Sequence, residues 1–198
     1  KTRILEELEK RGENIIDLEH LARHRGSLLG SLPGVEQPQQ KLFETLLCNN
    51  FKSLKFQNPV FIEAESSKIG NIQIPSPLWK AMRNSPQILV TSDRSKRAHY
   101  LLKDYDNLKT NQEGLFALFR LLEKSGLNTV AEECRNLSAK KDWVSLANVL
   151  LQSHYDKRYD RSIKSHERQT IMEFALPDLR PKNFKSLAKT ISETKLDI

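Results

Sequence analysis

The sequence predicts an α/β fold: a parallel sheet flanked by helices, with a mainly helical C-terminal part. Three observations predict it. Short apolar runs alternate with amphipathic stretches over roughly the first hundred residues, and such alternation is typical of parallel strands joined by crossover helices. The chain opens directly on a helical pattern, so we expect the first strand of the sheet to lie upstream of Lys1. From about residue 107 the apolar positions follow helical spacing instead.

The elements of the N-terminal part follow from local patterns. Apolar residues at helical spacing predict four helices, the first ending at Gly12, a glycine suited to a C-cap. Compact apolar runs predict three strands, and Gly and Pro mark two long loops between them. The expected helices are residues 1–11, 40–51, 78–83 and 93–105, the strands are 14–18, 60–63 and 87–91, and the loops are 22–40 and 66–77.

The C-terminal part has a different texture. Apolar clusters predict helices around residues 115–119, 130–131 and 144–151. A further apolar stretch predicts a returning strand near residues 170–175, with a helix after Pro181. We therefore divide the chain into an α/β core, residues 1–106, and a mainly helical part, residues 107–198.

Composition excludes several classes of protein. With 38% hydrophobic and 29% charged residues, the chain is typical of a folded globular protein. No apolar run approaches the roughly 20 residues that span a bilayer. Cys48 and Cys134 are far apart, which argues against a disulfide framework or a zinc site and favours the cytoplasm. A net charge of +7 and a pI near 9.4 favour a polyanionic partner.

Lys1 and Thr2 open the first helix. A phosphate-binding loop ends in Gly-Lys-Ser/Thr and runs into a helix, with its lysine on the terminal phosphates and its hydroxyl on the metal. The pair fits that tail. An ordinary helix start is the alternative.

Glu63 and Glu65 follow the second apolar run, Val-Phe-Ile. Carboxylates at the end of a parallel strand lie at the sheet edge where ligands bind in open α/β folds. There they can hold Mg²⁺ or position a nucleophile, so we predict Glu63 and Glu65 as catalytic residues. Solvated acids at a strand end are the alternative. No residue is singled out as a certain metal ligand.

Two basic segments suit phosphate oxygens. Arg23, Arg25 and Ser27 lie with His24 in a glycine-containing loop, where arginine forks can meet an anion and glycine lets the backbone approach. Arg97 follows the third predicted strand, near a helix N-terminus that favours anions. An ordinary basic loop and an ordinary helix cap are the alternatives.

Basic residues alternate with tyrosines in residues 154–168. Cations can meet RNA phosphates while aromatic rings stack on unpaired bases. A charged, solvated connector is the alternative. The predicted RNA-binding residues are His24, Tyr155, Lys157, Arg158, Tyr159 and Arg161.

Several motifs together resemble one family. Residues 17–27 read DLEHLARHRGS and are similar to the DLEgLAnHRGS stretch of tRNA 2-selenouridine synthases. Residues 37–40 read QPQQ, followed by Phe43-Glu44, and resemble their QPsQ…FE segment. Residues 61–70 read FIEAESSKIG and resemble vE.ESrkIG. Pro77-Leu78-Trp79 and Met82-Arg83 follow in the same order. The likeness covers roughly residues 1–105 and resumes at 154–156.

The resemblance implies a P-loop NTPase-like domain joined to an upstream rhodanese-like domain. It implies an enzyme, a transferase, that replaces sulfur by selenium in the wobble 2-thiouridine of tRNA. Selenophosphate is the donor, and the route passes through an S-geranyl intermediate made from geranyl diphosphate. No cofactor is certain, although Mg²⁺ is an option. Because the rhodanese cysteine would lie upstream, we expect the isolated chain to be inactive.

Carried over residue by residue, Lys1 and Thr2 resemble the end of the family's phosphate loop, and Glu63 and Glu65 its acidic strand end. Arg23, His24, Arg25 and Ser27 match its HRGS loop. Lys157 departs from the pattern, because many relatives have proline there. A nucleotide kinase or NTPase of the same fold, and a non-catalytic RNA-binding module, remain alternative functions.

Overall fold

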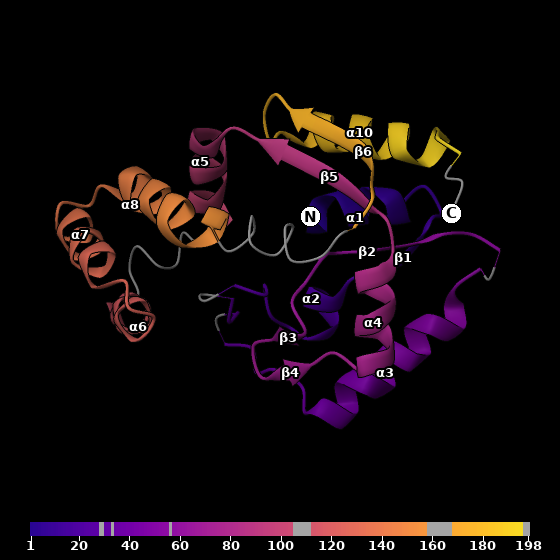
Figure 1. Ribbon diagram of the computed structural model, residues 1–198, viewed down its shortest axis with the longest axis horizontal. Coiled ribbons are helices and arrows are strands. Elements are labelled where there is room, and N and C mark those ends of the chain that lie inside the picture. Colours follow the sequence, from indigo (N-terminus) through magenta and orange to yellow (C-terminus); the bar gives the residue numbers. More distant parts are fainter. Residues whose placement is uncertain (28–29, 33, 56, 105–111, 158–167, 196–198) are drawn as a thin grey trace. The chain divides into compact units, whose positions relative to one another are not determined.

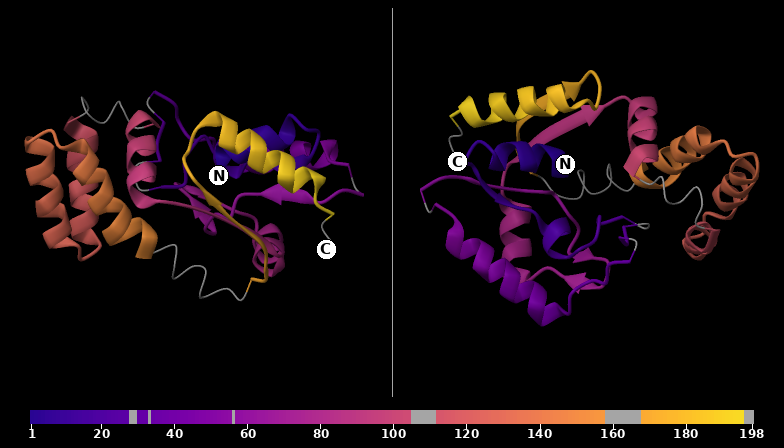
Figure 2. Two further views of the ribbon diagram at one scale, coloured as in Figure 1. Left: turned by 90° about the horizontal axis from the view of Figure 1, so that it is seen from above. Right: turned by 180° about the vertical axis from the view of Figure 1, so that it is seen from behind.

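The computed structural model describes residues 1–27, 30–32, 34–55, 57–104, 112–157 and 168–195. The chain divides into two compact units: residues 1–86 with 180–198, and residues 87–179. Each unit is described by itself. Figures 1 and 2 show the course of the chain through both.

The first unit contains one parallel strand pair, one short hairpin and five helices among the described residues. Its elements are α1 (Thr2–Glu9), β1 (Asn14–Ile16), α2 (Leu18–Leu21), α3 (Gln40–Ser53), β2 (Val60–Ile62), β3 (Lys68–Ile69), β4 (Ile72–Gln73), α4 (Ser76–Asn84) and α10 (Pro181–Glu193). β1 and β2 pair in parallel, from Asn14 opposite Val60 to Ile16 opposite Ile62. The carboxyl ends of both strands therefore meet at one edge.

The core of this unit lies between the strands and the helices α3 and α4. Its fully buried side chains include Ile16, Leu18, Phe43 and Ile74. Burying large apolar side chains stabilises the fold by about 1.5–3 kcal/mol each. This core fixes the ends of β1 and β2, from which the functional residues project.

Two glutamine side chains hold the β3–β4 hairpin. Gln37 Nε2 donates to the carbonyls of Ala22 (3.1 Å) and Ile69 (3.0 Å), and its Oε1 accepts from the Asn71 amide (2.8 Å). Gln40 exchanges two hydrogen bonds with the backbone of Gln73, at 2.8 and 2.9 Å. The QPQQ segment thus supplies hydrogen-bond partners for the β3–β4 hairpin, whose two-residue strands offer few hydrogen bonds of their own.

Helix α10 packs on α1, and Figure 2 shows the two side by side. Phe184, Leu187, Ala188 and Ile191 form its buried face. Beyond the end of α1, Ser192 Oγ donates a hydrogen bond to Glu13.

The second unit combines a parallel strand pair with a helical group. Its elements are β5 (Gln87–Ser92), α5 (Arg94–Asp104), α6 (Gln112–Lys124), α7 (Asn128–Ala139), α8 (Trp143–Leu150), the π-helix η2 (Leu151–Asp156) and β6 (Thr170–Leu176). β5 and β6 run parallel, from Gln87 opposite Thr170 to Ser92 opposite Leu176. Ala98 of α5 packs with Ala147 and Leu151.

The α/β class is confirmed: parallel strand pairs flanked by helices. Two local expectations were wrong. The first strand ends at Ile16, because Asp17 accepts from the His20 amide and begins α2. Residues 66–77, expected as a loop, contain the β3–β4 hairpin. The strand expected near residues 170–175 is β6. The domain division at residues 106 and 107 stays a prediction.

Candidate phosphate-binding site

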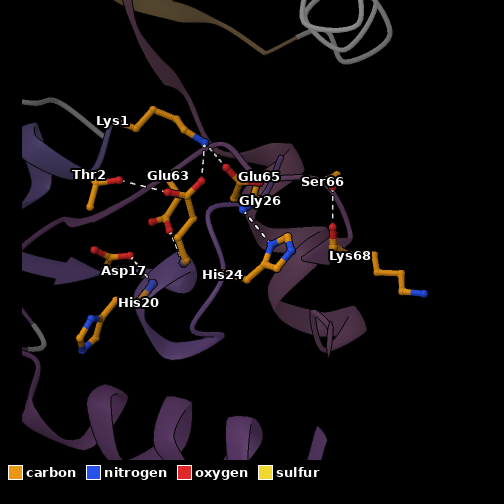
Figure 3. Close-up of polar contacts among 11 residues, drawn as sticks. Lys1, Thr2, Asp17, His20, His24, Gly26, Glu63, Glu65, Ser66 and Lys68 are labelled. Carbon is orange, nitrogen blue, oxygen red and sulfur yellow. Dashed lines mark hydrogen bonds and ion pairs between the residues drawn. The ribbon is translucent and has the colours of Figure 1, made fainter. Parts of the chain in front are cut away.

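Five side chains from three parts of the first unit meet at the N-terminus of α1 (Figure 3). The ammonium of Lys1 contacts carboxylate oxygens of Glu19, at 3.2 Å, and of Glu65. Thr2 Oγ1 donates to Glu19 Oε2 at 3.0 Å. The Glu19 amide donates to Glu63 Oε1 at 2.7 Å. Four predicted site residues, Lys1, Thr2, Glu63 and Glu65, thus lie together.

The parallel strand pair explains this convergence. Glu63 and Glu65 follow the last residue of β2, and Glu19 lies in the first turn of α2, just beyond β1. Because paired parallel strands end at the same edge, their following residues are brought into contact. The Asp17 cap turns the chain into α2 at once, which aims the Glu19 amide at Glu63.

Lys1 is held as a cation. Its side chain is 47% exposed, whereas that of Glu65 is 7% exposed. Partial desolvation opposes the charge, but the carboxylates of Glu65 and Glu19 outweigh it and raise the pKa of the Lys1 ammonium above its usual range. A permanent positive charge at a helix N-terminus suits a phosphate ligand.

Glu63 is the most unusual group of the cluster. The residue is 5% exposed, and its Oε2 has no hydrogen-bond partner. Burial raises the pKa of the Glu63 carboxyl to about 8, although the hydrogen bond from the Glu19 amide opposes the shift. Near neutral pH the group therefore carries a proton for much of the time and can exchange it. Such a group is a candidate general acid or base.

Burial also raises the pKa of Glu65, against the attraction of Lys1. Glu63 and Glu65 share one small site with Glu19, and like charges brought together disfavour full ionisation of all of them. Lys1 compensates part of that charge. A phosphate group arriving at Lys1 would compete with Glu65 for the same ammonium.

The HRGS loop closes over the carboxylates through Gly26. A Cβ atom on Gly26 would stand 2.5 Å from Glu65 Oε2 and 2.9 Å from Glu19 Oε1, and the residue has φ +66°. Both facts require glycine here. The loop backbone therefore lies against the carboxylates of Glu65 and Glu19, whereas its expected approach to a phosphate stays a prediction.

His24 lies inside that loop. Its ring is buried and its Nδ1 accepts from the Gly26 amide at 3.1 Å, which places the ring proton of the neutral form on Nε2. Desolvation lowers the pKa of His24, against the opposing charge of Glu19. A Cβ on Gly30 would meet the ring at 2.5 Å. His24 thus shapes the loop; its role in RNA binding stays a prediction.

The two arginines of the loop precede Gly26, and Ser27 follows it. Arg23 is exposed and has φ +49°, and Arg25 and Ser27 are half-buried. The Arg25 amide donates to the Gly30 carbonyl at 2.8 Å. The predicted contact of these residues with phosphate stays a prediction.

Arg97 belongs to the second unit and has a protein partner there. Its guanidinium makes a two-pronged contact with Asp156, at 2.8 and 3.0 Å, and Arg94 Nε meets the same carboxylate at 3.1 Å. Although partial burial acts the other way, these two arginines hold the pKa of Asp156 below its usual value. The contact joins α5 to η2 and leaves phosphate binding by Arg97 a prediction.

The predicted RNA-binding segment is only partly described. Tyr155 is half-buried, 5.2 Å from the ring of His154 in an edge-on arrangement, and Lys157 is exposed. Arg158, Tyr159 and Arg161 lie outside the described residues.

Sequence reasoning missed three residues. Glu19 belongs to the DLE motif, and an acid just beyond β1 is the same kind of signal as Glu63 just beyond β2. Gln37 belongs to the QPQQ motif, and no local pattern indicates its distant hydrogen-bond partners. Asp156 meets Arg97 across 59 positions, which spacing alone cannot reveal.

The Lys1 ammonium lies among the carboxylate oxygens of Glu19 and Glu65. These oxygen atoms are of the kind Mg²⁺ prefers. Nevertheless, within the described ranges no group of three or more His, Cys, Asp or Glu side chains is arranged to hold a metal ion. Among the described helices, none is both long and apolar enough to cross a membrane.

Comparison with known proteins decides the family. The family model described as the tRNA 2-selenouridine synthase AAA domain matches residues 1–120. The chain belongs to this tRNA 2-selenouridine synthase family. The matched residues include every member of the cluster at the start of α1.

Similar proteins from three bacteria carry the name of the same family. The tRNA 2-selenouridine synthase of Alcanivorax borkumensis is 29% identical over 191 residues, covering 81% of this chain and 51% of the relative. That of Nitrosomonas europaea is 35% identical over 108 residues, covering 53% of this chain and 28% of the relative. That of Aeromonas salmonicida is 36% identical over 107 residues, with the same coverage. The chain spans about half the length of the first relative and less of the others. No solved structure matches the chain.

Proposed function

We propose that this chain is the phosphate- and tRNA-binding part of an enzyme that converts wobble 2-thiouridine in tRNA to 2-selenouridine with selenophosphate. The observation that carries the proposal is the convergence of Lys1 and Thr2 with the buried Glu63 and Glu65, in a chain that belongs to the tRNA 2-selenouridine synthase family. The family supports the reaction, and the cluster supports the place where a phosphorylated donor binds.

The cluster suits a reaction in which a diphosphate departs. In the proposed first step, the sulfur of 2-thiouridine attacks the first carbon of geranyl diphosphate, a carbon–sulfur bond forms, and pyrophosphate leaves with the electrons of the broken carbon–oxygen bond. Lys1 would balance the charge that accumulates on the leaving oxygens. The N3 proton of the base passes to solvent in this step. The selenium of selenophosphate would then attack carbon 2 of the base, so that a carbon–selenium bond forms and the carbon–sulfur bond breaks with geranylthiol as the leaving group. Hydrolysis of the selenium–phosphorus bond would release phosphate and leave 2-selenouridine.

Glu63 would hold and transfer a proton at this site. Because its carboxyl is buried and its pKa lies near neutrality, it can hold a proton while a negative ligand binds and donate that proton as negative charge develops on the leaving diphosphate. An ionised carboxylate in the same place would repel the phosphate oxygens. The carboxylate of Glu65 would hold the Lys1 ammonium in place until the phosphate of the ligand replaces that carboxylate. Whether Mg²⁺ takes part stays a prediction.

The test uses the full-length protein that contains this chain. It is incubated with thiolated tRNA, geranyl diphosphate and selenophosphate, and the nucleosides are measured by mass spectrometry. We expect 2-selenouridine to form, and K1A and E63Q to lower its yield at least tenfold. E9Q, a change of an exposed acid on α1, should act as wild type. Unchanged nucleoside composition with the wild-type protein would contradict the proposal.

Phosphoryl transfer is a second candidate, favoured by a lysine and a threonine at the start of α1. Transfer of phosphate from ATP to a small acceptor, abolished by K1A, would favour a kinase. A third candidate, a non-catalytic RNA-binding module, predicts RNA binding that survives both K1A and E63Q, with no nucleoside change. The same protein preparations distinguish all three.

A further inference from the structure

The solvent face of α10 is a row of hydrogen-bond donors. Lys182, Lys185 and Lys189 are exposed at a spacing of three and four residues, which places them on one stripe of the helix. Exposed Ser186 lies between Lys185 and Lys189, and exposed Thr190 follows Lys189. The helix has a single acidic residue, Glu193, at its last position.

These lysines differ from the cations of the neighbouring α1. There, Arg3 pairs with Glu6 at 3.0 Å and Lys10 with Glu7 at 2.6 Å. In the part of the chain that the structure describes, neither Lys182 nor Lys185 forms an ion pair within 4.0 Å, and Lys189 only meets Glu193 at 3.8 Å. Within those residues the charges of Lys182 and Lys185 are not neutralised by a direct ion pair, and that of Lys189 only by a distant one.

The apolar face of α10 is buried within its own unit. Phe184, Leu187, Ala188 and Ile191 are all buried. A basic amphipathic helix that binds a membrane surface must insert its apolar face into the lipid, and this one cannot without leaving its unit. None of the large apolar side chains that are exposed elsewhere lies on α10. The stripe thus lacks the apolar centre of a protein interface.

The direction of α10 connects the stripe with the candidate site. Ser192 contacts Glu13, and the hydrogen bond from Lys10, together with the charge of Lys185, holds the pKa of Glu7 below its usual value. Later residues of α10 thus lie beside later residues of α1, so the two helices run in the same direction (Figure 2). The N-terminal end of the stripe therefore lies toward the end of α1 that carries Lys1 and Thr2.

We propose that Lys182, Lys185 and Lys189 form a contact surface for the sugar–phosphate backbone of RNA, leading toward the cluster at the start of α1. Repeated ammonium groups on one rigid helix suit the repeated charges of a phosphate backbone, which they bind without reading sequence. The inference rests on the proposed function, because it names tRNA as the polyanion. It assigns the binding of that tRNA to a helix outside the residues 154–168 predicted from sequence.

The test compares two triple variants of the full-length protein that lose the same charge. One carries K182Q, K185Q and K189Q. The control carries K41Q, K52Q and K80Q, exposed lysines of α3 and α4. The affinity for an unmodified tRNA transcript is measured over a range of salt concentrations. Each lost phosphate contact should flatten the plot of log affinity against log salt by about 1.

We expect the α10 variant to lose roughly 2–3 in slope and at least tenfold in affinity at low salt, while the control changes little. Equal behaviour of the two variants would overturn the inference. Polyglutamate should compete more weakly than tRNA for this surface, and equal competition at matched charge would overturn the assignment to RNA. Circular dichroism and thermal unfolding establish that α10 remains packed in both variants.

The outcome separates the inference from the function on which it rests. If the wild-type protein binds tRNA and forms 2-selenouridine while the α10 variant binds as tightly as the control, the inference fails and the proposed function stands. If the wild-type protein binds tRNA and the α10 variant alone is weakened, but no nucleoside changes, the surface stands and the proposed function fails.

Discussion

The backbone amide of Glu19 donates a 2.7 Å hydrogen bond to Oε1 of Glu63. This bond links the segment after β1 to the segment after β2, across 44 positions of sequence. It satisfies one oxygen of a buried carboxyl and leaves the other, Oε2, without a partner. The fold thereby fixes one oxygen of Glu63 and leaves the other buried without a hydrogen-bond partner.

E63Q should remove a pH dependence of stability. The folded protein holds the Glu63 proton with a pKa near 8, whereas the ordinary value of a glutamate carboxyl is 4.5. Between these values the folded state binds more protons than the unfolded state, so stability falls as pH rises from about 5 to about 8. Glutamine cannot ionise, and the free energy of unfolding of E63Q should fall less over this range. Urea unfolding at several pH values measures this dependence. The control E9Q should show the wild-type change of the free energy of unfolding with pH. An equally steep change in E63Q would refute the raised pKa of Glu63.

G26A should damage the site far more than G34A. Both glycines have positive φ, +66° and +69°, so alanine strains both by about 1–2 kcal/mol. Only at Gly26 would the new methyl group meet the carboxylates of Glu65 and Glu19; nothing lies within 4 Å at Gly34. We expect G26A to lose activity at least tenfold while G34A loses stability alone. Activity assays with thermal unfolding of both variants decide the matter, and equal activities would count against the close packing of the loop.

Q37A should destabilise the first unit more than Q39A. Removing the Gln37 amide leaves the carbonyls of Ala22 and Ile69 and the amide of Asn71 without their partner. Unsatisfied buried groups cost about 1–3 kcal/mol each, less where water can reach them, so we expect a loss of roughly 2–4 kcal/mol. Gln39 is exposed in the same motif and should cost little. Urea unfolding of both variants tests this, and a difference below about 0.5 kcal/mol would show that the hairpin does not depend on Gln37.

D156N should loosen the contact of α5 with η2. The carboxylate of Asp156 binds both Arg94 and Arg97, and charged hydrogen bonds of this kind contribute roughly 1.5–3 kcal/mol before solvent screening of these partly exposed side chains. We expect a loss of about 1–2 kcal/mol and faster amide exchange in η2. E132Q removes one exposed acid from α7 and serves as the control. Unchanged exchange in η2 would mean that the ion pair does not hold this segment.

Local pattern predicted much of the fold and part of the site. Alternating apolar runs indicated the parallel strands, and an acid after an apolar run indicated Glu63 and Glu65 at their ends. The β3–β4 hairpin was not predicted. Strands of two residues are too short to show an alternating pattern, and this hairpin depends on the distant Gln37 and Gln40. Long-range polar contacts such as that of Asp156 with Arg97 were not predicted either, since hydrogen bonds between side chains depend on the folded geometry and not on the spacing along the chain.

The central claim is that Lys1, released from Glu65, binds the phosphate of the donor. Calorimetric titration of the full-length protein with pyrophosphate tests it most directly, comparing K1A with K10A, whose lysine pairs with Glu7 on the outside of α1. The account predicts that K10A binds pyrophosphate as wild type does and that K1A binds it at least tenfold more weakly. Equal affinity in K1A and wild type would contradict the account.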